Sequence, residues 1–184
     1  PFSNLDATLR TRVRSDIHRI LRESNTSAVF VTHDQDEAFS MADRIGIMLN
    51  HTVAQIGKPE EVYLNPASLD VARFLGIDNV LSGVSDGRIV QCELGGLKAV
   101  NVHPSGDVQV AIRPQAIRVL PADQTSTEAI VISREFHGFH KELGLELASG
   151  TILRSVMGIH IPAESGDRVS IEVNGEIAVF QSST

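Results

Sequence analysis

Cysteine, long apolar runs and positive charge are all scarce in this sequence of 184 residues. Cys92 is the single cysteine, which excludes a disulfide within the chain and suits a reducing cytosol. The longest apolar runs, such as residues 45–49, have about five residues against the ~20 that span a membrane, so a membrane role requires a partner protein. The net charge of −7, from 16 basic and 23 acidic residues, disfavours a non-specific nucleic-acid-binding protein.

The composition is that of an ordinary globular protein, with 42% hydrophobic and 21% charged residues. A chain of this length forms one ordinary domain or two small ones. It begins with Pro1 and carries no signal-peptide pattern, so we expect a fragment of a longer protein.

The first part of the chain mixes helical and strand-like patterns. Helical spacing of apolar residues over residues 6–24 predicts an amphipathic helix whose arginines line a solvated face. Consecutive apolar residues within residues 27–32 are typical of a buried strand in a parallel sheet. Asp34 and Glu37 have the spacing of a helix-start box, which predicts a helix up to about Ala42. We expect further strands at residues 44–49 and 52–56, and helices at residues 59–64 and 68–75.

After Gly76 the helical spacing disappears, and short strand-like runs separated by turn signals take its place. Asp86-Gly87 and Asn174-Gly175 are dipeptides that join antiparallel strands. Short strands at this spacing predict a small β-barrel or sandwich, beginning near Ile77 and Asp78. We expect the strands at residues 80–84, 88–93, 97–102, 108–113, 117–120, 128–134, 142–147, 151–156, 168–173 and 177–180.

Two short segments near the N-terminus carry the chemistry. Ser3-Asn4-Leu5-Asp6 precedes the first predicted helix, and Val31-Thr32-His33-Asp34 ends the first predicted strand. A histidine at the carboxyl end of a parallel strand lies where α/β sheets place their ligands. These segments resemble the D-loop and the switch-histidine segment of the nucleotide-binding domain of ATP-binding-cassette (ABC) transporters.

This resemblance implies a role for each segment. His33 would contact the γ-phosphate of ATP and help to place the attacking water. The D-loop would contact the nucleotide site of the opposite subunit, and it would consist of Ser3, Asn4, Leu5 and Asp6. Asp6 can cap the following helix at the same time.

The phosphate-binding half of such a domain is missing from the sequence. A phosphate loop needs the pattern G-x-x-x-x-G-K-[ST], but Gly57-Lys58 is followed by Pro59, which leaves no hydroxyl to bind Mg²⁺. The resemblance implies a complete parent subunit that binds ATP and Mg²⁺ and hydrolyses ATP. This chain alone is expected to be inactive and to bind no cofactor.

The later part of the chain carries a second resemblance. Residues 72–79 resemble the exit from the nucleotide-binding domain in importers for maltose, polyamines and ferric iron. Residues 111–117 resemble an Arg-Pro-Glu segment of their regulatory β-domain, with Gln115 in place of the glutamate. The implied architecture is an α/β remnant of a P-loop nucleotide-binding domain over residues 1–77, followed by an all-β barrel of the OB-like (TOBE) type over residues 78–184.

The chain is thus identified as the C-terminal portion of an ABC importer's ATP-binding subunit. Such a subunit is cytoplasmic, lies at the inner face of the membrane, docks on transmembrane permease subunits and forms a homodimer. Its β-domain would regulate or dimerise the subunit and take a small regulatory ligand. Ferric iron, polyamines, sugars and oxyanions all stay open as the transported substrate.

Two other interpretations stay open beside the importer. The β-domain can be a stand-alone sensor of an oxyanion, metal or small metabolite, or the whole chain can be a structural dimerisation fragment. His137 and His140 have a spacing that brings two imidazoles together. Surface histidines on a β-turn are the commoner case, and we expect no metal site.

Overall fold

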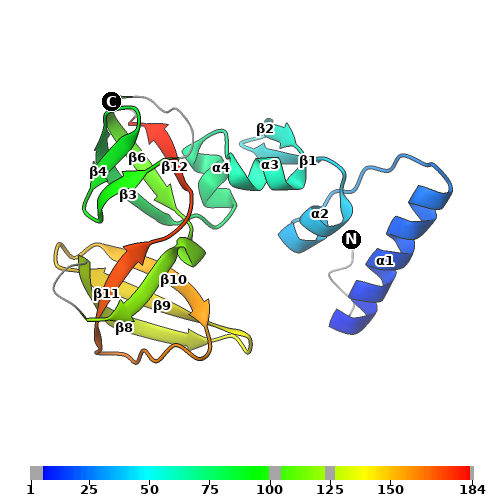
Figure 1. The fold of residues 1–184 in the computed structure, drawn as a ribbon. Coiled ribbons are helices and arrows are strands. Elements are labelled where there is room, and N and C mark those ends of the chain that lie inside the picture. The colour runs from blue at the N-terminus through cyan, green and yellow to red at the C-terminus, as the bar shows by residue number, and fades with distance from the viewer. Residues whose placement is uncertain (1–5, 100–104, 123–126, 183–184) are drawn as a thin grey trace. The chain divides into compact units, whose positions relative to one another are not determined.

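The computed structural model describes residues 6–99, 105–122 and 127–182. The chain divides into two compact units, Pro1–Ala67 and Ser68–Thr184 (Figure 1). Helix α4 (Leu69–Phe74) belongs to the second unit because Ala72 packs with Ile77 and Ala111 in one buried cluster. The functional boundary expected at residues 77 and 78 stays a prediction.

The first unit begins with the helix expected from the apolar spacing. Asp6 accepts a hydrogen bond from the backbone N–H of Leu9 at 2.9 Å and thereby caps the first turn of this helix. The expected helices and the strand pair that follow are confirmed; the strands are antiparallel. The elements are α1 (Ala7–Glu23), α2 (Gln35–Met41), β1 (Ile45–Leu49), β2 (Thr52–Gly57) and α3 (Pro59–Leu64).

The strand expected at residues 27–32 does not form, and that prediction was wrong. These residues have no regular structure, and the side chains of Val29 and Val31 are 94% and 87% exposed. A parallel strand takes its backbone hydrogen bonds from strands on either side. In the described part of this unit, β1 and β2 pair only with each other. The apolar run therefore lacks the partners that its sequence pattern anticipates.

The second unit is built almost entirely of strands, as expected. They form two five-stranded sheets with the orders β12-β6-β3-β4-β5 and β10-β9-β8-β11-β7. The strands are β3 (Asn79–Ser85), β4 (Ile89–Cys92), β5 (Gly95–Lys98), β6 (Gly106–Ile112), β7 (Ile117–Pro121), β8 (Thr127–Phe136), β9 (His140–Leu147), β10 (Ile152–Gly158), β11 (Arg168–Val173) and β12 (Ile177–Gln181). A short 3₁₀ turn, η1 (Pro114–Ala116), joins β6 to β7.

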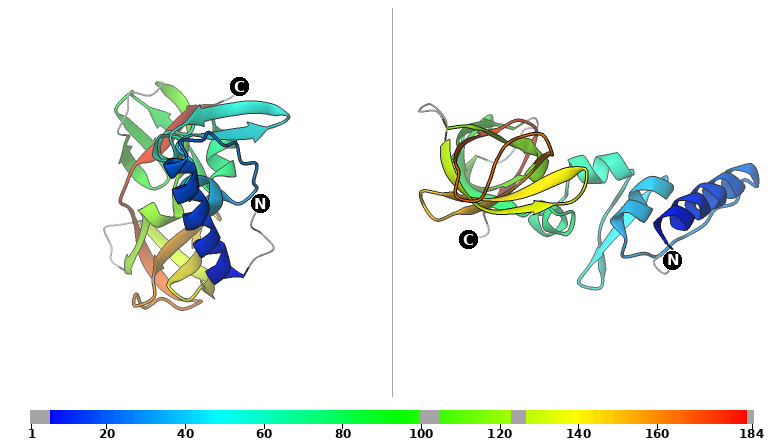
Figure 2. Two further views of the ribbon diagram at one scale, coloured as in Figure 1. Left: turned by 90° about the vertical axis from the view of Figure 1, so that its right-hand side faces the viewer. Right: turned by 90° about the horizontal axis from the view of Figure 1, so that it is seen from below.

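One apolar core joins the two sheets of this unit. It contains Val110 from the first sheet and Leu145 and Leu153 from the second, all essentially buried. The second sheet curls on itself (Figure 2). Its two end strands are β10 and β7, and the hydroxyl of Ser155 in β10 donates to the carbonyl of Ile117 in β7 at 2.7 Å. Closure of this kind is typical of small OB-like barrels.

A buried asparagine fixes one sheet to the other. The amide of Asn79 in β3 donates to the carbonyl of Arg154 in β10 at 2.8 Å and accepts from the N–H of Arg154 at 2.6 Å. The N–H and the carbonyl of Arg154 thus both have hydrogen-bond partners outside the β9–β10 strand pair.

Among the helices of the described residues, none combines the length and the apolar character that a membrane-spanning helix needs.

Candidate functional site

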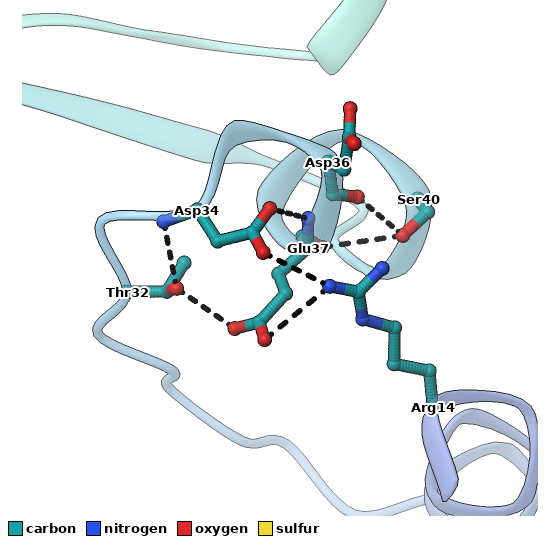
Figure 3. A network of polar contacts seen from close by, with 6 residues as sticks. All are labelled: Arg14, Thr32, Asp34, Asp36, Glu37 and Ser40. Atoms are coloured by element: carbon teal, nitrogen blue, oxygen red, sulfur yellow. Dashed lines mark hydrogen bonds and ion pairs between the residues drawn. The ribbon is translucent and has the colours of Figure 1, made fainter. Parts of the chain in front are cut away.

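His33 lies on a turn whose neighbours are anchored on both sides. The hydroxyl of Thr32 accepts a hydrogen bond from the N–H of Asp34 at 3.0 Å. The carboxylate of Asp34 in turn accepts from the N–H of Glu37 at 3.1 Å and caps helix α2 (Figure 3). The side chain of His33 is exposed between these two anchors. A histidine held in this way can present its imidazole to a ligand without rearrangement of the backbone.

A partly buried network of ion pairs connects this turn to helix α1. The hydroxyl of Thr32 donates to Glu37 Oε2 at 2.8 Å. Arg14 of helix α1 places Nη2 3.3 Å from Glu37 Oε1 and 3.2 Å from Asp34 Oδ2 (Figure 3). Glu37 is 3% exposed, so its charge depends on these partners. The network therefore ties the His33 turn to both helices.

The ionisation of Glu37 reflects this arrangement. Burial is the largest influence and raises the pKa of the carboxyl, because it penalises the charged form. Hydrogen-bond donors around it, among them Thr32 and Arg14, outweigh burial and lower the pKa of Glu37 from 4.5 to about 2. The carboxylate is thus ionised throughout the physiological range.

The first unit is expected to lose stability as the pH falls. A carboxyl whose folded-state pKa is lowered stabilises the fold fully above its unfolded pKa of 4.5, and this contribution disappears as the pH falls through about 2. In Glu37→Gln we expect that pH dependence to shrink and the unfolding free energy at pH 7 to fall by about 1–3 kcal/mol. Amide exchange in α1 and α2, measured against pH, tests this. Asp36→Asn, an exposed first-turn residue, is the control, and an equal loss in both variants would contradict the role of the network.

The structure places the predicted site residues at two separate helix starts. Asp6 caps α1, and His33 precedes α2. The remaining residues of the predicted D-loop lie outside the described residues: Ser3, Asn4 and Leu5. Their contact with an opposite subunit stays a prediction.

Sequence reasoning missed the contribution of Arg14. The expectation of a solvated face is wrong for this arginine, since its side chain is 16% exposed and faces acidic groups. One signal was present: Arg14, Ile17 and Leu21 have the spacing of one helix face, so Arg14 shares the apolar stripe. The partner Glu37 lay on another helix, and helical spacing alone cannot show that pairing.

The second unit contains the other residues that the sequence singled out. Residues 111–117 run from the end of β6 through η1 into β7, and Arg113 among them is 8% exposed. His137 and His140 flank the turn between β8 and β9, as expected for histidines on a β-turn. Their rings stack with a centroid distance of 4.9 Å, and the carboxylate of Glu142 lies close to both.

Comparison with known proteins relates nearly the whole chain to import proteins. Residues 110–180 match the TOBE domain family. The chain is 35% identical over 185 aligned residues to the Fe(3+) ions import ATP-binding protein FbpC 2 of Pectobacterium atrosepticum, covering 98% of this chain and 54% of that protein. It is 34% identical to the protein FbpC of Streptomyces coelicolor, with 94% and 49% covered.

The chain spans about half the length of the curated relatives it matches. Among solved structures, it is similar to the cytoplasmic molybdate-binding protein ModG with molybdate bound. That similarity has a TM-score of 0.48 and 14% identity, and it covers 57% of this chain and 96% of ModG.

Proposed function

We propose that the chain belongs to the ATP-binding subunits of ABC importers and carries a TOBE domain, and we infer its function from that family. In this proposal residues 1–77 come from the nucleotide-binding domain, and residues 78–184 form the regulatory domain. The complete subunit binds ATP and Mg²⁺ and couples hydrolysis to solute uptake. The observation that carries the proposal is the relation at 35% identity over 98% of the chain.

The geometry of the first unit supports a role in sensing ATP. His33 is exposed on a turn that Thr32 and Asp34 hold in place. An imidazole that contacts the γ-phosphate and positions water has to be held in this way, because misplacement by an ångström costs much of the rate. Asp6, at the start of α1, would act across the interface with a second copy of the subunit.

The remaining parts of the proposal concern partners and cargo. The subunit works as a homodimer at the cytoplasmic face of the membrane, docked on the permease subunits of the importer. The related proteins of Pectobacterium and Streptomyces are named for the import of Fe(3+), and we take ferric iron as the cargo. Deletion of the gene should abolish ATP-dependent uptake of radiolabelled ferric iron, and uptake should return on complementation. Unchanged iron uptake would remove this cargo.

The chain of residues 1–184 is expected to bind no ATP and to hydrolyse none. The sequence contains no phosphate loop, whose backbone amides and lysine hold the phosphates. Isothermal titration with MgATP should therefore show no saturable heat, and phosphate release should equal the buffer blank. Micromolar affinity for MgATP would contradict this expectation.

A further inference from the structure

The end of the β8–β9 hairpin holds polar side chains that the transport role does not use. The N–H of His137 donates to the carbonyl of His140 at 2.9 Å and closes the hairpin around Gly138. In the strand register, Glu135 lies opposite Glu142. Opposite residues of an antiparallel pair share a face, as do residues two apart on a strand. The two glutamates and the two histidines therefore form one four-residue array.

The distances within this array approach those of a metal site. The rings of His137 and His140 stack at 4.9 Å with an interplanar angle of 13°. One nitrogen of each ring and one carboxylate oxygen of Glu142 all lie within 4.8 Å of one another. Ligands of one tetrahedral ion lie roughly 3.4 Å apart when metal–ligand bonds are about 2.1 Å. To bind one ion, the two histidines, which lie outside the core, have to leave this stacked arrangement and turn one nitrogen each toward Glu142.

The charges around the array favour a cation. Two carboxylates directly opposite one another on a sheet repel, as Glu135 and Glu142 do here. His137 Nε2 lies 3.5 Å from Glu135 Oε2, so the second carboxylate adjoins the imidazole pair. Lys141 brings no competing charge, because it lies on the other face of β9 and donates to the carbonyl of Ile161 at 3.2 Å.

One cation already contacts the array, since Arg154 forms an ion pair with Glu142. Arg154 Nε lies 3.3 Å from Glu142 Oε1, and Arg154 also pairs with Asp78 at 3.5 Å. Carboxylates that bind metals are commonly held by such outer partners. A carboxylate has two oxygens, so Glu142 can keep this contact and still offer an oxygen to an ion.

We propose that His137, His140 and Glu142 bind a divalent first-row transition-metal ion at the end of the β8–β9 hairpin. Two imidazoles with one carboxylate suit Zn²⁺, Ni²⁺, Cu²⁺ or Fe²⁺. Ca²⁺ and Mg²⁺ prefer ligand sets made of oxygen alone and are excluded. The sequence analysis expected no metal site at the two histidines. The strand register, which places Glu135 opposite Glu142, was not visible from the sequence. The proposed site is independent of the transport role.

Titration of the EDTA-treated chain with Zn²⁺ tests the proposal. We expect saturation at one ion per chain in calorimetry, with the ring signals of both histidines shifting together in NMR spectra. His137→Gln and His140→Gln should each raise the Kd for Zn²⁺ about tenfold or more. Neither substitution reaches the core, so the amide spectra of the variants should match that of the original chain.

Two further measurements keep the assignment specific. His51→Asn, at an exposed turn between β1 and β2, removes a histidine far along the sequence and should leave the Kd unchanged. Ca²⁺ should produce no shift of the histidine ring signals. An unchanged Zn²⁺ affinity in the double variant His137→Gln/His140→Gln, or equal binding of Ca²⁺ at the array, overturns the proposal.

Discussion

His33→Ala in the complete ATP-binding subunit is expected to lower kcat by roughly 10²–10⁴-fold. The Kd for MgATP should change only a few-fold. The reason is that a group which positions water and contacts the γ-phosphate acts mainly in the transition state, so its removal affects turnover more than binding. Phosphate release at saturating ATP, together with calorimetric binding of MgATP, measures the two quantities separately.

The matched control for this substitution is His18→Ala, which removes a histidine of helix α1 outside the anchored turn. It should leave kcat and Kd unchanged. Near-normal turnover in His33→Ala would remove the catalytic role. A loss of ATP binding equal to the loss of turnover would show that His33 supports the ground state instead.

Leu145→Ala is expected to lower the unfolding free energy of the second unit by about 2–5 kcal/mol. Leu145 is fully buried in β9, and its neighbours in the register are Val131 of β8 and Leu153 of β10. Truncation leaves a cavity between three strands that a closed sheet cannot easily collapse to fill. Urea unfolding, followed through the amide signals of β8–β10, measures the change.

Ile152→Ala is the control for the core substitution. Ile152 starts the edge strand β10 and is 63% exposed, so its truncation should cost less than about 0.5 kcal/mol. Equal costs for the two variants would mean that packing at Leu145 is looser than its burial indicates.

The fold of the second unit was largely predictable because turn chemistry marks its strand ends. Gly87, for example, has a φ of +93° in the turn between β3 and β4, a conformation that favours glycine. Four of the strand pairs, β3–β4, β4–β5, β8–β9 and β9–β10, join strands that follow one another in the sequence. The assignment of strands to two sheets was not predictable, because contacts such as Asn79 with Arg154 join residues 75 positions apart.

The candidate site was only partly predictable. Asp34 signals the start of α2 through its own side chain, a local effect that spacing reveals. The pairing of Arg14 with Glu37 depends on how two helices meet, which local pattern does not encode. For residues 27–32, the apolar pattern predicts a buried strand. It cannot show whether neighbouring strands are present to pair with that strand and cover it.

The exposed run at residues 27–32 has a consequence for the behaviour of the protein in concentrated solution. Its sequence, Ser-Ala-Val-Phe-Val-Thr, contains no charge and no proline, and it is rich in residues with high β-propensity. Six-residue segments of this kind stack readily between chains as cross-β aggregates. Any segment or partner chain that paired with this run would therefore also protect the protein against fibril formation.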